Sequence, residues 1–114
     1  MKMLLKAFIY SIVLALITLF SVSLFWTNQI ILTTIIVVIS VIMLLIWRDK
    51  EDVYLYIIVA VSGAIAEAIA IGFGVWTYTL PDFIGIPIWL PFVWGMAGLF
   101  VKKISIEIHE VVKN

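Results

Sequence analysis

The amino-acid sequence predicts an all-α integral membrane protein, a single domain over residues 1–114. We expect four transmembrane helices in an antiparallel bundle, followed by a short C-terminal interfacial helix. Composition is the first reason: 66% of the residues are apolar, 12% are charged and the mean hydropathy is +1.30. A soluble domain could not cover such a chain with polar groups. Length is the second reason, since 114 residues allow about four spans of ~20 residues each. The third is the order of apolar runs and charged breaks.

The first two helices are expected at 4–26 and 30–47. The first apolar run, at ~20 residues, is longer than the roughly 7–15-residue core of a signal peptide, so we interpret it as a membrane helix. The polar break at 27–29 is short, and the second helix should therefore return antiparallel beside the first. Each helix carries a stripe of small or hydroxyl residues, which is typical of helix contacts in lipid. The stripes are Ser11, Ala15 and Thr18 on the first helix, and Thr33, Val37 and Ser40 on the second.

The dense charge cluster at 48–52 predicts a solvated loop, and a third helix is expected at 53–76. An irregular segment leads to a fourth helix at 87–101, because Pro87 is well suited to the first position of a helix. Two consecutive lysines should end that helix at the membrane interface. The tail, 102–114, has apolar residues at helical spacing and predicts a short interfacial helix rather than an unpaired strand. These residues are Ile104, Ile108, Val111 and Val112.

The basic residues predict the orientation in the membrane. With four spans, all the basic residues near the helix ends fall on one side, and the opposite loops carry no Lys or Arg. Cytoplasmic loops are enriched in these residues, so both termini and the 48–52 loop are expected in the cytoplasm of a multi-pass protein of the cell membrane. The residues concerned are Lys2, Lys6, Arg48, Lys50, Lys102 and Lys103.

Composition also limits the chemistry. The zero net charge gives no electrostatic reason to expect a nucleic-acid partner, and the expected surroundings are the lipid bilayer. The chain has no Cys and one His, so it offers neither a thiolate nucleophile nor a cluster of Cys and His ligands. We therefore expect neither a metal nor another cofactor.

Glu67 is the only acidic or basic side chain between Val53 and Pro81. An acid in the middle of a membrane helix costs roughly 2.5–3.5 kcal/mol on insertion scales, so it needs a partner, a proton or a function. At 100° per residue it shares a helix face with small residues, and the fourth helix has a similar Gly-containing face. On the third helix these residues are Ala60, Gly63, Ala64, Ala70 and Gly74; on the fourth they are Pro87, Pro91, Trp94, Gly95, Gly98 and Lys102.

The opposite face of the fourth helix carries Val93 and is assigned to lipid. Glu67 should lie near the depth of Pro91 to Trp94, where Pro91 is expected to kink the helix and the Trp94 indole N–H can donate to the acid. Two interpretations stay open for Glu67: a neutral hydrogen-bonding clamp between the helices, or a group that handles a ligand, a proton or a substrate. The candidate groove between the two helices comprises Glu67, Trp94, Tyr78, Pro91, Gly63, Gly74, Gly95 and Gly98.

Three segments carry a family resemblance: Gly63-Ala-Ile-Ala-Glu67, Gly74-Val-Trp-Thr-Tyr78 and Gly85-Ile-Pro-Ile-Trp-Leu-Pro-Phe-Val-Trp-Gly95. Over residues 63–98 the pattern resembles part of the integral-membrane carotenoid hydratase and lycopene-cyclase-type proteins. The resemblance implies a polyene substrate, acid-initiated protonation of a double bond and no metal. The positions that match are Glu67, Tyr78, Gly85 and Pro87. The cyclase type has a pair of acids just after this Pro, where this chain has Ile88, Trp89 and Leu90.

Three functions are compatible with the sequence. The first is a binding or accessory subunit that holds an apolar lipid, an isoprenoid or a transmembrane helix of another subunit or a second copy in the groove. The second is a carotenoid-type enzyme or half-enzyme in which Glu67 is the catalytic acid. The third is a component of a proton or ion pathway, although Glu67 has no relay of further polar residues beside it.

Overall fold

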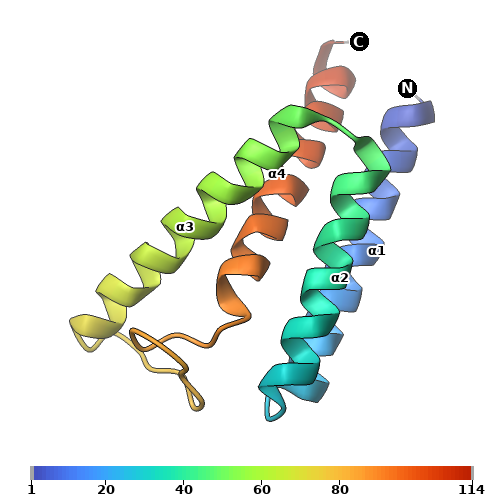
Figure 1. Ribbon diagram of the computed structural model, residues 1–114. Coiled ribbons are helices and arrows are strands. Elements are labelled where there is room, and N and C mark those ends of the chain that lie inside the picture. Colours follow the sequence, from blue (N-terminus) through green and yellow to red (C-terminus); the bar gives the residue numbers. More distant parts are fainter. Residues whose placement is uncertain (1, 114) are drawn as a thin grey trace.

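The computed structural model describes residues 2–113 and is helical, as the sequence predicts. The four helices are α1 (Lys2–Phe25), α2 (Gln29–Trp47), α3 (Lys50–Gly72) and α4 (Leu90–Lys113). Among the described residues no β-strand forms, and the one isolated bridge joins Phe83 and Ile86. The start of α1, the α2–α3 connection and the end of α4 lie at one end of the molecule, and the other two connections lie at the opposite end (Figure 1).

Three of the helices are long and apolar enough to cross a membrane. The spans are Phe8–Phe25 in α1, Gln29–Ile46 in α2 and Lys50–Gly72 in α3. α4 is as long as α1, but its C-terminal half carries Lys, Glu and His side chains, which lower its mean hydropathy. The membrane class predicted from composition therefore agrees with the lengths and compositions of three helices.

Short capped turns connect α1, α2 and α3. Asn28 is the N-cap of α2, and its side-chain oxygen accepts a hydrogen bond from the Ile31 N–H at 3.2 Å. At the other end of α2, Arg48 adopts a left-handed conformation with φ 49°, and Asp49 then caps α3 by accepting from the Glu51 N–H at 2.9 Å. Two residues thus reverse the chain, because both unsatisfied helix ends are capped locally. The prediction of a solvated loop over 48–52 is wrong from Lys50 onward, where α3 has already begun.

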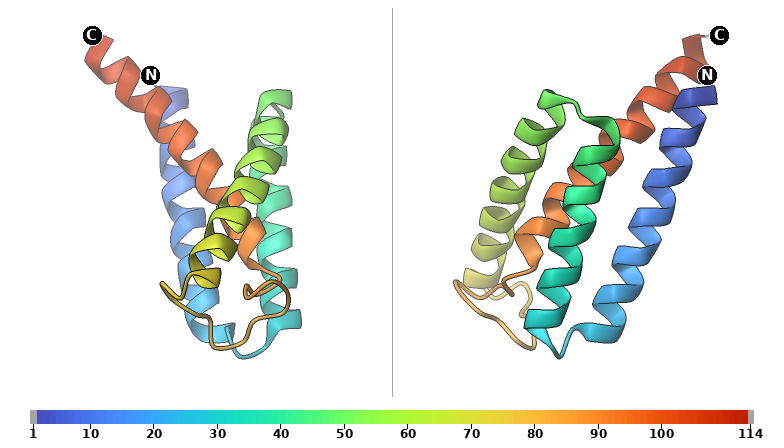
Figure 2. Two further views of the ribbon diagram at one scale, coloured as in Figure 1. Left: turned by 90° about the vertical axis from the view of Figure 1, so that its left-hand side faces the viewer. Right: turned by 45° about the vertical axis from the view of Figure 1, so that its right-hand side comes forward.

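α4 packs between α3 and the α1–α2 pair (Figure 2). Its residues meet those of α2 and α3 in a buried core, so the side of α4 that was assigned to lipid is also covered. Trp89 and Met96 are only 8% and 5% exposed, and Val93 packs against the core. The lipid-facing assignment of Val93 is therefore wrong, because the sequence reasoning paired α4 with α3 alone. The core residues are Leu32, Ile36, Ile39, Met43, Tyr56, Ala64, Ile86, Trp89, Leu90, Met96 and Leu99.

The helix boundaries around the loop differ from the prediction. α3 ends at Gly72 rather than near residue 76, and Gly74 lies beyond it with φ 79°. α4 begins at Leu90 rather than at Pro87, so Pro91 occupies its first turn, where the missing N–H leaves no intrahelical bond unmade. Pro91 therefore gives no cause for the kink that the sequence predicted in this helix.

The C-terminal part of α4 continues without a break to Lys113, so the separate interfacial helix predicted for 102–114 is part of α4. Lys102 and Lys103 do not end the helix: they lie within α4, and both bond to Asp52 of α3. The last turns of α4 extend past α3 (Figure 2).

The loop 73–89 folds back on the helix ends. Ile84 and Gly85 have φ values of 42° and 83°, which make the tight turn between the bridged residues Phe83 and Ile86. Asp82 accepts a hydrogen bond from the Ile88 N–H at 2.7 Å and so closes the turn. The fully buried Ile86 anchors the loop in the core.

Candidate functional site

Glu67 lies on α3 and is only 9% exposed. Its Oε1 accepts a hydrogen bond from the Tyr78 hydroxyl and its Oε2 accepts one from the Trp94 indole Nε1, both at 2.5 Å. The acid therefore joins α3 to the loop and to α4 through one carboxyl group. The hydrogen bond from Trp94 expected from the sequence is present. The sequence reasoning did not connect Tyr78 to the acid by geometry, because Tyr78 stands in an irregular segment with no helical register.

The neighbours of this site fix the two donors. Gly63 lies one turn before Glu67, and a Cβ atom there would overlap the Trp94 ring, so only glycine lets the indole lie against α3. The Tyr78 ring stands edge-on to Trp89, with the centroids 6.5 Å apart at 89°. Burial, reinforced by the hydrogen bond to Glu67 and by its charge, raises the pKa of Tyr78. Tyr78 thus keeps its proton and remains a donor.

The predicted groove between α3 and α4 is filled by the protein's own side chains. The Trp94 ring covers Gly63, Tyr56 would meet a Cβ on Gly95 at 2.8 Å, and Val59 would meet one on Gly98 at 2.8 Å. Tyr56 is itself held by its hydroxyl, which lies 2.6 Å from the Ser40 hydroxyl and donates to the Phe92 carbonyl at 3.2 Å.

The candidate groove residues thus separate into two groups. Glu67, Tyr78, Trp94 and Gly63 come together as one hydrogen-bonded cluster, which we call the Glu67 clamp. Gly95 and Gly98 permit close packing of the helices in place of an open groove. Gly74 belongs to neither, since it lies beyond α3 and a Cβ there would meet nothing within 4 Å, and Pro91 serves to begin α4.

A cavity of about 330 Å³ lies on the other side of α4, bounded by α1, α4, one residue of α2 and Trp89 of the loop. Apolar side chains make up most of its wall, and the Thr18 hydroxyl is already bonded to the Leu14 carbonyl at 2.8 Å. The sequence reasoning identified the Ser11, Ala15 and Thr18 stripe as a helix contact but not as one wall of a cavity. The full lining is Ser11, Ala15, Thr18, Leu19, Val22, Met43, Trp89, Val93, Met96, Ala97 and Phe100.

An ionic cluster joins α3 to α4 at the opposite end from the loop 73–89. Asp52 is fully buried, with Oδ1 2.5 Å from the Lys102 Nζ and Oδ2 3.0 Å from the Lys103 Nζ. Lys102 also lies 3.5 Å from Asp49. Burial acts to lower the pKa of Lys102, but the hydrogen bond and charge of Asp52, together with Asp49, raise it overall. The hydrogen bond from the Glu51 N–H lowers the pKa of Asp49 despite its partial desolvation, and the lysines add to that effect.

Within residues 2–113, no group of three or more His, Asp or Glu side chains is arranged to hold a metal ion. No family model matches the chain, and no curated protein or solved structure matches it significantly. The fold and these sites define a class only: a small helical protein with three helices able to span a membrane.

Proposed function

We propose that this chain is a multi-pass membrane protein that binds the apolar chain of a lipid in the cavity between α1 and α4. The observation that carries the proposal is the cavity itself. Its volume of about 330 Å³ falls at the lower end of the roughly 300–1,000 Å³ found for small-molecule sites. Its wall is apolar, so an acyl or isoprenoid chain would be matched in polarity along its whole length.

We commit to a lipid chain rather than a partner helix. An extended hydrocarbon chain is much thinner than a helix, which is about 10 Å across, so the side chains that line this one cavity are enough to surround it.

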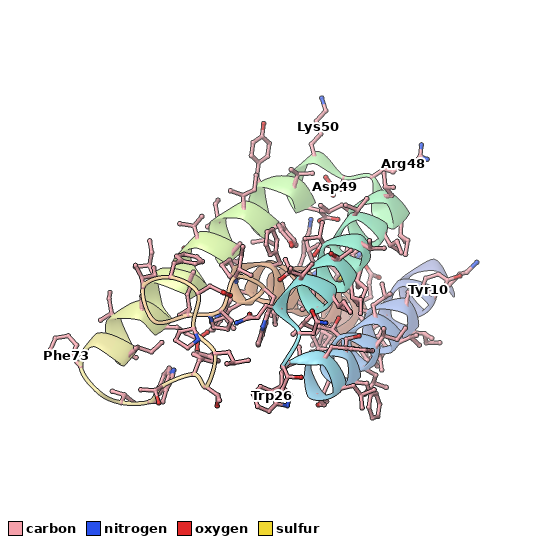
Figure 3. The ribbon with its side chains drawn as sticks, turned by 60° about the horizontal axis from the view of Figure 1, so that its bottom comes forward. Tyr10, Trp26, Arg48, Asp49, Lys50 and Phe73 are labelled. Carbon is pink, nitrogen blue, oxygen red and sulfur yellow. The ribbon has the colours of Figure 1, made fainter. Side chains whose placement is uncertain are left out.

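The proposed topology has four spans, of which the fourth is residues 87–101, made of the apolar N-terminal half of α4 and the three residues before it. The start of α1 and the end of α4 lie at the same end of the molecule (Figure 1). Arg48 and Lys50 also lie at that end, and Trp26 and Phe73 lie at the other (Figure 3). The basic end would face the cytoplasm and the aromatic end the opposite interface of the cell membrane.

Within this proposal the Glu67 clamp has a structural role. Both carboxyl oxygens already accept hydrogen bonds from side chains of the protein. The clamp also lies on the α3 side of α4, whereas the cavity lies on the α1 side. We therefore assign Glu67 to holding α4 and the loop in the position that forms one wall of the cavity.

Photolabelling with a long-chain alkane that carries a diazirine tests the proposal. The protein would be reconstituted in phosphatidylcholine nanodiscs, labelled and mapped by mass spectrometry. Ala97→Phe should fill the cavity and lower the labelling of its wall several-fold. Val101→Phe, one turn further along α4 at a side chain 63% exposed, is the matched control and should label like the parent protein. Equal labelling of the parent and the Ala97→Phe variant, both folded by circular dichroism, would overturn the proposal.

A further inference from the structure

A second cavity of about 220 Å³ adjoins the first. The two share Val22 of α1 and Trp89, which therefore stand between them. Trp89 is 8% exposed and is held edge-on against Tyr78. The lining of the second cavity is Val22, Trp26, Tyr78, Thr79, Leu80, Pro87 and Trp89.

The polarity of the wall changes from one cavity to the other. The second cavity is formed by the α1–α2 turn and the loop 73–89, at the end of the molecule where Trp26 lies (Figure 3). Two of its lining residues carry hydrogen-bond donors, the indole N–H of Trp26 and the hydroxyl of Thr79. The Tyr78 hydroxyl donates a hydrogen bond to Glu67, and its oxygen keeps lone pairs that can accept one. Trp and Tyr side chains are typical of the membrane–water interface, so the cavities run from hydrocarbon depth to headgroup depth.

The wall of the second cavity has no charged side chain. In the connecting segments at this end, 26–28 and 73–89, the only charged residue is Asp82, which accepts a hydrogen bond from the Ile88 N–H and lines a different depression. A phosphate or carboxylate in the second cavity would lose water without gaining a cationic partner, which is costly, and an ammonium group would meet no carboxylate there. An uncharged hydroxyl head avoids that cost and can pair with polar groups that the lining residues Trp26, Thr79 and Tyr78 carry.

Resting on the proposed function, we infer that the occupant is a single-chain lipid with an uncharged, hydroxyl-bearing head. Its chain lies in the cavity between α1 and α4 and its head lies in the second cavity. The head donates to the Tyr78 oxygen and accepts from the Thr79 hydroxyl.

Three photoreactive probes with the same terminal diazirine and chain length test the inference. Dodecanol, dodecanoate and dodecyltrimethylammonium differ only in their heads and would be compared at equal concentration in phosphatidylcholine nanodiscs. Dodecanol should label the wall of the first cavity several-fold more than either charged probe. Thr79→Val should lower that labelling roughly two- to tenfold, as the loss of one neutral hydrogen bond predicts. Thr77→Val is the matched control, because Thr77 is exposed and does not line the second cavity.

The outcomes separate this inference from the proposed function. Equal labelling by all three probes, with Ala97→Phe still blocking each, would overturn the uncharged head and leave chain binding intact. Equal effects of Thr79→Val and Thr77→Val on dodecanol labelling would overturn the placement of the head. Failure of every probe and of the alkane to label the cavity would overturn the proposed function, and the inference with it.

Discussion

The indole of Trp94 lies directly against Gly63, and its Nε1 donates to Glu67 one turn further along α3 at 2.5 Å. Gly63 and Glu67 thus act on the same tryptophan: Gly63 leaves room for the indole ring, and Glu67 accepts its N–H. Close approach of two helices at a glycine is the usual way in which membrane helices gain packing energy, since lipid offers no hydrophobic drive. Here the close approach also brings the indole N–H to Oε2 of Glu67, while Oε1 accepts from Tyr78.

The first prediction concerns this fit. Gly63→Ala should destabilise the protein by about 1–3 kcal/mol, because the new Cβ overlaps the Trp94 ring and forces the helices apart. Gly72→Ala is the control at the end of the same helix, where a Cβ meets nothing within 4 Å, and it should not destabilise. Thermal unfolding in detergent measures both. Equal melting temperatures for the two variants would contradict the placement of Trp94.

The second prediction distinguishes clamp from catalysis at Glu67. Glu67→Gln keeps a carbonyl oxygen for the Trp94 N–H, and the Tyr78 hydroxyl can rotate to accept from the new amide. This variant should therefore stay folded and still label with the alkane probe. Glu67→Leu leaves the indole N–H without an acceptor and should cost on the order of 1–3 kcal/mol.

The informative result is that of the Gln variant. Stability and labelling like those of the parent protein would support the clamp. A Gln variant that is as stable as the parent but no longer binds the alkane would show that the carboxyl group itself is needed for function.

The Glu67–Trp94 contact could be predicted from sequence because both residues have a defined helical register. Counting at 100° per residue placed Gly63 and Glu67 on one face, and counting inward from the ends of the two helices gave Trp94 a similar depth. Tyr78 has no such register, so its partnership with Glu67 depends on a loop path that sequence periodicity does not encode. For the same reason the sequence predicted the start of the last helix at Pro87, whereas α4 begins at Leu90.

Two features depended on contacts between distant segments and were missed. Asp52 and Lys102 are 50 positions apart, and each charged run by itself is typical of a solvated surface. The cavity likewise depends on how α1 packs against α4, two helices at opposite ends of the sequence. The small residues Ala15 and Ala97 leave this space open, but their alignment becomes apparent only when all four helices are in place.

The third prediction concerns pH and the ionic cluster at Asp52. Lys102 lies just beyond the proposed fourth span, and its pKa is raised in the folded state above the usual 10.5, chiefly through Asp52. A raised pKa contributes stability that is fully present below 10.5 and is lost as pH rises through the folded value. The parent protein should therefore lose stability above pH 10.5 to a greater extent than Lys102→Met, whose side chain cannot titrate. The melting temperatures of the two proteins would be measured from about pH 8 upward. A difference between them that stays roughly constant with pH, as expected without linkage, would contradict the contribution of Lys102.

The last prediction tests the proposed topology with single cysteines, which the parent chain lacks. Thr27 lies in the α1–α2 turn and Lys50 at the start of α3, and both are exposed, at opposite ends of the molecule. If the basic end faces the cytoplasm, Thr27→Cys should react with a membrane-impermeant maleimide in intact cells, and Lys50→Cys should react only after the membrane is opened. Both variants should label fully in detergent, which controls for the reactivity of each thiol. Labelling of Lys50→Cys alone in intact cells would reverse the orientation. Labelling of both would mean that the two ends are not separated by the bilayer. The cavity between α1 and α4 would then not lie at the membrane depth that binding of a lipid chain requires.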